Sequence, residues 1–403
     1  MNDMPLSDSV NEISDAVSIR FNQITYDLKR IGHDPIVLSL GEAFFDLPLF
    51  DFTPTDIEKG FHYSDSQGIP ELRDQIAGMY NSKYGASIAP ENVLVTAGSK
   101  FAIYAAMLTV LNTGDEVLVH DPCWLSYPHQ ARLAGGVPKA IPFDVPTSDF
   151  SQFFTTKTRL LILNNPNNPA GRVYTRQELL ELYSECRKRS IYLLVDEAYS
   201  DFVLEDSFSS IATIVPDLEG VIVVNSLSKN MGMSGWRIGY AIGNHRFIQA
   251  LLKVNQHAIT CAPTILLRYV STYFDQILSI TLPQVREVVE KRRKVSLMMD
   301  ELGLKRLHGS ATFYFFVSIE GFPGTSTDLA KYLLLKKMIV VVPGIAYGDS
   351  TDRFIRVGIG AETEERIWEA LQVIKAVISL SEVPDVNYEA ALATLLPNGH
   401  HVL

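Results

Sequence analysis

Lys229 stands among the kinds of residue that surround a reactive amine. It lies in the segment 225–240, which reads Asn-Ser-Leu-Ser-Lys-Asn-Met-Gly-Met-Ser-Gly-Trp-Arg-Ile-Gly-Tyr. Burial near other cations lowers the pKa of a lysine and frees its lone pair for attack on a carbonyl carbon. Ser226, Ser228 and Arg237 supply hydroxyl donors and a planar cation, which are groups that bind phosphate. The segment therefore favours a Schiff-base lysine beside a phosphate, whereas Lys229 alone could be an ordinary surface residue.

Asp196 is a second candidate for chemistry. It directly follows the apolar run 191–195, so we expect it at the edge of a nonpolar sheet. A carboxylate at such a place is costly unless it is paired, and a protonated ring nitrogen of a cofactor would be a suitable partner. Tyr199, three residues later, could hydrogen-bond a cofactor hydroxyl. The alternative for Asp196 is a helix N-cap.

The elements that must position these residues form a repeating pattern. Short apolar runs alternate with helical patterns, which predicts a mostly parallel sheet with helices on both faces. These runs lie at 92–95, 116–119, 160–163, 191–195 and 221–224. Unusual polar or aromatic residues follow their ends, namely Ser99, Lys100, Trp124, Asn168, Asp196, Ser226 and Lys229. Ligands of open α/β sheets bind at that edge, so we expect one site there.

The chain length and a change of texture predict two domains. At roughly 150 residues per domain, 403 residues allow two or three. After about residue 280 a long charged helical pattern is followed by short strands. We expect a large domain over 49–280 and a smaller α+β domain built from 1–48 and 281–403. The tail 379–403 is weakly patterned and suggests no function.

Composition excludes several classes of protein. Apolar residues make up 47% and charged residues 20%, which excludes a disordered chain. The 46 acidic and 35 basic residues leave a net charge of −11, which argues against nucleic acid and anionic membranes as partners. The three cysteines have no metal-ligand spacing, so we expect no metal and a reducing compartment. With no apolar run near the ~18 residues of a membrane span and no signal peptide pattern, we expect a cytoplasmic protein.

Several segments together resemble one enzyme family. Ser-Leu-Ser-Lys at 226–229, followed by Gly-Trp-Arg-Ile-Gly-Tyr, is similar to the lysine motif of class I aminotransferases, which are pyridoxal-phosphate enzymes of fold type I. Further segments match other motifs of that family, from about residue 35 to 375 and in the family's order. They are 41–48 with Gly-Glu and Phe-Asp, Tyr63, 68–73 with Gly-Ile-Pro-Glu-Leu-Arg, 167–171 with Asn-Asn-Pro-Ala-Gly, and 195–199 with Val-Asp-Glu-Ala-Tyr.

The resemblance implies roles around the cofactor ring. Lys229 would hold the aldehyde of pyridoxal 5′-phosphate as an internal aldimine and then move the substrate proton as base and acid. Asp196 would pair with the pyridinium nitrogen. Tyr199 and Asn168 would hydrogen-bond the ring oxygen. Trp124 would stack on the ring face, with an ordinary core aromatic as the alternative.

The resemblance also implies a phosphate cup. Backbone N–H groups of Ser99 and Lys100 would donate to the phosphate from the start of a helix, where the helix dipole favours an anion. Ser226, Ser228 and Arg237 would complete the cup. Since the chain is acidic overall, the site should be a local island of cations.

Two further roles concern the substrate and a second subunit. Arg356 matches the family's arginine that binds the substrate α-carboxylate, near Gly41 and Asn168. Arg353 is the competitor, although strand alternation places it on the opposite face. Tyr63 would reach the phosphate of the neighbouring subunit, which predicts a homodimer. The alternative for Tyr63 is a local core residue.

The expected reaction is transfer of the amino group of an L-amino acid to a 2-oxo acid. A carbon–sulfur lyase, an elimination synthase, or an oxidative or decarboxylating enzyme could use the same residues. A regulator that binds DNA is disfavoured, because the acidic chain has no spare basic helical segment. Ala43, Ala170 and the pair Asn230-Met231 depart from the family's usual residues and leave the substrate open. We expect a broad or neutral-to-acidic preference.

Overall fold

The structure is a computed structural model that describes residues 4–204, 208–382 and 388–395. Its centre is a seven-stranded sheet with the order β2-β8-β7-β6-β5-β3-β4. The strands are β2 (Val93–Thr96), β3 (Glu116–His120), β4 (Val137–Ile141), β5 (Thr158–Asn164), β6 (Tyr192–Asp196), β7 (Val221–Ser226) and β8 (Gly239–Gly243). β8 runs antiparallel to both of its neighbours, and the other six strands all run in one direction. The predicted α/β class is confirmed, with the five predicted apolar runs in this sheet.

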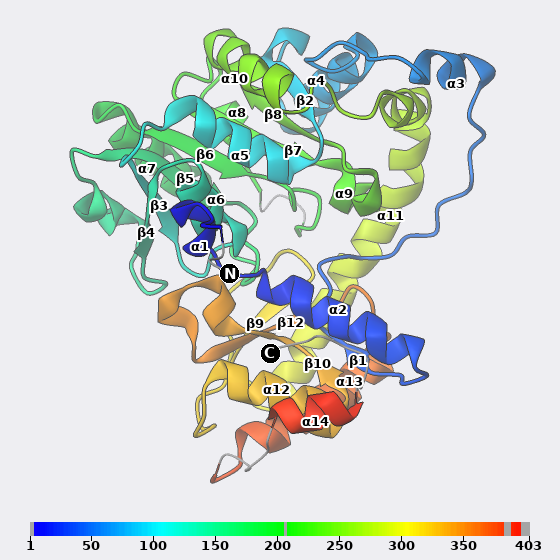
Figure 1. Ribbon diagram of the computed structural model, residues 1–403, viewed down its shortest axis with the longest axis vertical. Coiled ribbons are helices and arrows are strands. Elements are labelled where there is room, and N and C mark those ends of the chain that lie inside the picture. Colours follow the sequence, from blue (N-terminus) through cyan, green and yellow to red (C-terminus); the bar gives the residue numbers. More distant parts are fainter. Residues whose placement is uncertain (1–3, 205–207, 383–387, 396–403) are drawn as a thin grey trace.

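Helices cover both faces of the sheet (Figure 1). They include α4 (Pro70–Tyr84), α5 (Ser99–Val110), α6 (Ser126–Leu133), α7 (Arg176–Lys188), α8 (Ile211–Ile214), α9 (Leu227–Asn230) and α10 (His245–Ala258), whereas α3 (Pro54–Gly60) lies at the edge of the molecule and packs against α11 (Thr264–Glu301) (Figure 1). Alternate strand residues join two different cores. Leu194 of β6 packs with the core of α5 and α10, whereas Leu193 and Val195 pack with that of α4 and α7. Burial on both faces explains why these strands are continuously apolar.

A second, smaller group of elements lies below the sheet in Figure 1. An antiparallel sheet has the order β11-β12-β9, and β1 pairs in parallel with β10. Their bounds are β1 (Ile36–Val37), β9 (Tyr314–Ser318), β10 (Ile339–Val340), β11 (Val342–Pro343) and β12 (Phe354–Gly358). The helices of this group are α2 (Val17–Arg30), α12 (Ser326–Lys337), α13 (Glu364–Ile378) and α14 (Tyr388–Leu395), whereas α1 (Asp8–Asn11) lies beside α6 of the large group (Figure 1). Short 3-10 turns lie at Pro90–Asn92, Thr147–Phe153, Ser234–Trp236, Gly344–Tyr347 and Asp349–Thr351.

The long helix α11 (Thr264–Glu301) joins the two groups, with a non-helical residue at Tyr273 (Figure 1). Its residues up to Ile277 pack in a core of the large sheet, and those from Val285 pack in the core of the smaller group. Phe21 of α2 also packs in the smaller group's core. These separate cores support the predicted division near residue 280, which stays a prediction.

Within the described ranges, no helix is long and apolar enough to cross a membrane. The three cysteines, Cys123, Cys186 and Cys261, are all free thiols. In the same ranges, the structure has no cluster of three or more His, Cys, Asp or Glu side chains that could hold a metal ion.

Candidate active site

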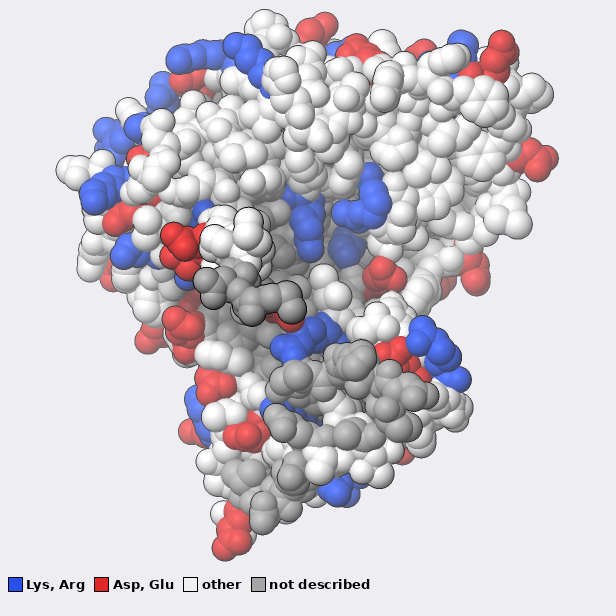
Figure 2. Space-filling view, in the orientation of Figure 1, with Lys and Arg blue, Asp and Glu red and all other residues white. Residues whose placement is uncertain are grey.

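Most of the predicted residues meet in one cavity of about 480 Å³ at the carboxyl edge of the large sheet, although Arg356 and Tyr63 are not among its lining residues. The predicted residues that line it are Gly41, Ser99, Lys100, Trp124, Asn168, Asp196, Tyr199, Ser226, Ser228, Lys229 and Arg237. Lys and Arg side chains gather in the hollow between the upper and lower parts of the molecule in Figure 2, while acidic side chains lie mostly around the outside. A local group of cations in an acidic protein is therefore present.

Lys229 presents its amine to this cavity from the short helix α9. Its Nζ donates a hydrogen bond of 2.6 Å to the main-chain oxygen of Gly41. Burial is the main cause that lowers the pKa of Lys229, and Arg356 and Arg237 act in the same direction. Glu42 and Asp196 oppose them, and the net pKa is about 8. An amine with this pKa can act as both acid and base near neutral pH.

One end of the cavity presents donors suited to a phosphate. Helix α5 starts at Ser99, and the first turn of any helix has N–H groups without helical partners. Gly98 precedes it with a φ of 84°, and a Cβ there would lie 2.4 Å from the Arg237 guanidinium. Glycine therefore lets that cation lie against the helix start. Ser226 caps α9 through a 2.9 Å hydrogen bond from the Ser228 N–H, which brings both hydroxyls to the same end.

The opposite end contains the buried Asp196 carboxylate at the end of β6. Its Oδ2 accepts a 2.7 Å hydrogen bond from the Tyr127 hydroxyl, and its Oδ1 accepts one of 3.1 Å from the Ala198 N–H. Burial raises the pKa of Asp196 to about 6, whereas these two donors and Lys229 lower it. Each oxygen keeps accepting capacity, so the carboxylate can take a cationic partner from the cavity.

Asn168 and Tyr199 lie between these ends as a bonded pair. The Asn168 amide Nδ2 donates to the Tyr199 hydroxyl at 3.2 Å, and that hydroxyl contacts the Tyr314 hydroxyl at 3.1 Å. The main-chain N–H of Asn168 donates to Asn164 Oδ1 at 2.6 Å, which fixes the loop after β5. The Asn168 amide and the hydroxyls of Tyr199 and Tyr314 thus form one hydrogen-bonded row at this wall of the site.

Arg356, rather than Arg353, faces this wall. Arg356 is only 3% exposed, and its Nη1 donates to Asn168 Oδ1 at 3.3 Å. Its guanidinium also lies 4.4 Å from the centre of the Tyr314 ring. Arg353 points the other way and donates to the main-chain oxygens of Gly324 and Phe322. The strand alternation of β12 therefore separates the two arginines as predicted.

Trp124 and Tyr63 occupy very different places. Trp124 lines the cavity, with its ring centre 5.2 Å from that of Tyr127 and 5.0 Å from the Lys100 Nζ. Tyr63 does not reach the cavity of its own subunit. It is 85% exposed, which contradicts the alternative that it is a local core residue.

Known proteins resemble this chain over most of its length. The family described as "Aminotransferase class I and II" matches residues 53–374. The chain belongs to this family. It is 33% identical over 352 residues to a (5-formylfuran-3-yl)methyl phosphate transaminase of Methanocaldococcus jannaschii, covering 86% of this chain and 92% of that protein. It is 30% identical to an aspartate aminotransferase of Thermotoga maritima, covering 92% and 98% respectively.

A solved structure agrees with the sequence matches. The aspartate aminotransferase of Thermus thermophilus with maleate superposes with a TM-score of 0.83 and 29% identity, covering 94% of this chain and 100% of that one. The protein is thus a pyridoxal-phosphate-dependent aminotransferase of fold type I, acting on amino acid and 2-oxo acid substrates. Its residues fit the cofactor: a glycine-lined cationic cup lies at one end of the cavity, and a buried carboxylate lies at the other.

The aminotransferase site contains residues that the sequence patterns did not single out. They are Ile19, Asn22 and Tyr26 of α2, and Tyr127, Asn164 and Tyr314. Asn164 follows the apolar run 160–163, so the rule about strand ends could have found it. Ile19, Asn22 and Tyr26 have helical spacing, which indicates a shared face but not what that face contacts.

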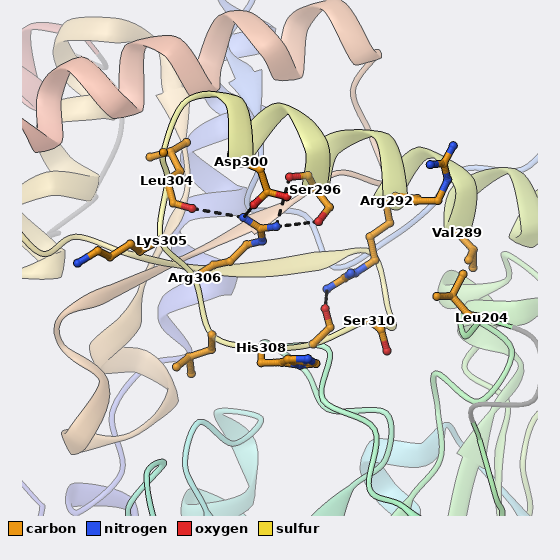
Figure 3. Close-up of a pocket in the computed structure, with 14 residues that line it drawn as sticks. Leu204, Val289, Arg292, Ser296, Asp300, Leu304, Lys305, Arg306, His308 and Ser310 are labelled. Carbon is orange, nitrogen blue, oxygen red and sulfur yellow. Dashed lines mark hydrogen bonds and ion pairs between the residues drawn. The ribbon is translucent and has the colours of Figure 1, made fainter.

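A larger hollow of about 960 Å³ lies under α11 and contains none of the predicted site residues (Figure 3). Its arginines are engaged with the protein itself. Arg306 pairs with Asp300 at 2.9 Å and donates to Ser296 Oγ at 2.7 Å. Arg292 donates to the Gly309 oxygen at 2.8 Å and lies 4.3 Å from the Phe315 ring centre. These arginine contacts therefore connect helix α11 to the loop 303–310.

Proposed function

We propose that Lys229 is the catalytic residue of this aminotransferase. The observation that supports this most directly is its amine, which has a lowered pKa and lies in a cavity with Asp196 and Arg237. When bound, pyridoxal phosphate supplies an electron sink for the bond that breaks at the substrate Cα. Lys229 would take the proton from the substrate Cα and deliver it to C4′, the former aldehyde carbon of the cofactor. The net reaction moves the amino group of an L-amino acid to a 2-oxo acid.

Residues at the two ends of the cavity make the remaining contacts with the cofactor in this proposal. Ser226, Ser228, Arg237 and the N–H groups of Ser99 and Lys100 hold the phosphate. At the other end Asp196 pairs with the ring nitrogen and keeps the ring protonated. The wall formed by Asn168 and Tyr199 hydrogen-bonds the ring oxygen, and Trp124 covers the ring face. Together these contacts would hold the ring in the cavity that the Lys229 amine also lines.

Arg356 binds the substrate α-carboxylate in this proposal. Its planar fork gives two parallel hydrogen bonds, which orient the Cα–H bond toward Lys229. The position of Arg356 beside Asn168, only 3.3 Å away, supports this role. Gly41 brings the N-terminal segment over the same place, since its oxygen lies 2.6 Å from the Lys229 amine.

The substrate side chain faces Lys100 and helix α2. In the described ranges, Lys100 has no carboxylate partner, and the Asn22 side chain lines the same cavity. A wall with such an ammonium group and a neutral amide can bind neutral and acidic substrate side chains. The aspartate aminotransferases among the relatives support the acidic end of this range. Replacing Lys100 with Met should slow acidic donors more than neutral ones; equal effects would refute this contact.

The half-reaction tests the reaction itself. An amino acid added without an acceptor should convert the lysine-bound cofactor to pyridoxamine phosphate, with release of one 2-oxo acid. A carbon–sulfur lyase or elimination synthase would instead release ammonia, and an oxidative enzyme would consume oxygen. A decarboxylating enzyme would release carbon dioxide. Any of these products in place of pyridoxamine phosphate would overturn the proposal.

We further propose a cytoplasmic homodimer in which Tyr63 completes the site of the partner. Support comes from exposed apolar residues of the same N-terminal part of the chain, since Phe61, two residues before Tyr63, is 77% exposed and Leu49 is 99% exposed. Free cysteines suit a reducing compartment. Light scattering should give twice the chain mass. Tyr63→Phe should weaken cofactor binding without changing that mass, and a monomer with full activity would contradict the proposal.

A further inference from the structure

The carboxylate of Asp196 is held by two donors of different kinds. The Ala198 N–H comes from the adjacent backbone, so any aspartate in this turn could accept it at Oδ1. The donor to Oδ2 is the Tyr127 hydroxyl, which lies 69 positions away in the chain and 2.7 Å away in space. Tertiary packing therefore provides the bond that sets the direction of the carboxylate.

Burial and packing fix the position of Tyr127, so its hydroxyl can orient the Asp196 carboxylate. It lies in the first turn of α6, is 1% exposed, and packs in the core between α5 and the sheet. Burial and the Asp196 charge hold the pKa of Tyr127 well above its usual range, so the hydroxyl keeps its proton and donates. The ring of Trp124, which lines the cavity, packs edge-on against that of Tyr127 behind it, so the two rings support each other.

The other groups around Asp196 cannot replace this donor. The Lys229 amine acts on Asp196 only through its charge and donates to the Gly41 oxygen. Tyr199 bonds with Asn168 and Tyr314. The Glu197 carboxyl accepts from Tyr80 and Ser210 and donates nothing to Asp196. Removing the Tyr127 hydroxyl would leave Oδ2 without its hydrogen bond in a buried place.

We propose that Tyr127 is a positioning residue of this aminotransferase, whose hydroxyl holds the Asp196 carboxylate ionised and turned toward the cofactor's ring nitrogen. The proposal rests on the role of Asp196 proposed above. It adds a group that touches neither substrate nor cofactor and that acts only through Asp196.

Tyr127→Phe tests the bond, with Tyr174→Phe as the matched control. Tyr174 is also 1% exposed, and its hydroxyl also bonds one side chain, His120 Nδ1 at 2.8 Å, outside the cofactor cavity. Each change removes one oxygen and keeps the ring that fills the core. Both proteins should therefore fold, which thermal unfolding checks.

The first measurement is the titration of Asp196 in the cofactor-free protein, followed by 13C-carboxyl NMR and assigned with Asp196→Asn. Loss of a donor to the ionised form should raise the pKa of Asp196 above its starting value of about 6 in Tyr127→Phe. Tyr174→Phe should leave it unchanged. An unchanged titration in Tyr127→Phe would overturn the proposal.

The second measurement separates this inference from the function on which it rests. Tyr127→Phe should slow the half-reaction by about tenfold with little change in the KM for the amino donor. Asp196→Asn should slow it far more. Full activity of Asp196→Asn would refute the role of Asp196 itself. A slow Asp196→Asn with a wild-type Tyr127→Phe would refute only the positioning role.

Discussion

The aminotransferase cavity and the hollow under α11 both contain several cations but use them differently. In the hollow, Arg306 pairs with Asp300, and Arg292 is bound by main-chain oxygens and the Phe315 ring. In the cavity, within the described ranges, Lys229 and Arg237 have no carboxylate within ion-pair distance. Cations left without anions around a cavity indicate an anionic ligand, whereas paired cations indicate structure. The number of basic residues alone does not distinguish the two.

Among the cations that this comparison concerns, the largest effect should come from the geometry of Arg356. Arg356→Lys keeps the positive charge but loses the planar fork, so the substrate carboxylate loses one of two parallel hydrogen bonds. We expect kcat/KM for amino acids to fall by about 10² or more. Amines that lack a carboxylate provide the control, because their slow reaction should change little. An equal loss for both substrates would show that Arg356 acts on the fold.

A smaller effect should follow from removing the cation at the phosphate end. Arg237→Met should raise the dissociation constant of pyridoxal phosphate by about ten- to a hundredfold, since a charge-assisted hydrogen bond is lost. The matched measurement uses pyridoxal, which lacks the phosphate and whose binding should not change. If both ligands weaken alike, Arg237 is not a phosphate ligand.

The lowered pKa of Lys229 predicts how the cofactor-free protein captures pyridoxal phosphate. Attack requires the neutral amine, so below about pH 8 the rate should rise about tenfold per pH unit and then level off. N-acetyl-lysine methylamide under the same conditions corrects for changes in the aldehyde. A rate that keeps rising past pH 10 would show an unperturbed lysine, contrary to the enclosed amine described here.

The smallest kinetic effect is expected in the hollow. Arg306→Met removes the pair with Asp300 and the hydrogen bond to Ser296, so the free energy of unfolding should fall by about 1–2 kcal/mol. Cofactor binding and kcat should stay at their wild-type values, as denaturant titration and the half-reaction can measure. Loss of cofactor affinity in this variant would remove the contrast between the two regions.

Much of the site could be predicted, because several of its residues belong to short local patterns in the sequence. Asp196 and Lys229 follow buried parallel strands, and the ends of such strands meet at one edge. The same reasoning did not find β4 or β8. β4 is an edge strand with mostly exposed or half-buried residues, and β8 begins and ends with glycine, so neither has the apolar run of a central strand.

Other parts depend on contacts far apart in the chain. In the sequence Tyr127 stands in the Pro-containing stretch 120–128, which predicts a loop, and only the packing of α6 on the sheet brings its hydroxyl to Asp196. The helical spacing of Ile19 and Asn22 predicts a helix face, but the fold of the second group of elements decides that this face lines the cavity. The exposed Tyr63 needs a second chain, which no pattern within one chain can place.

The central claim is that the Lys229 amine carries the proton in transamination. The most direct measurement compares the half-reaction of the wild-type enzyme with that of Lys229→Ala loaded with pyridoxal phosphate, under the same amino donor. The wild type should convert fully to pyridoxamine phosphate, whereas Lys229→Ala should bind the cofactor and convert it at least about 10²–10⁴ times more slowly. Conversion of Lys229→Ala at the wild-type rate would contradict the account.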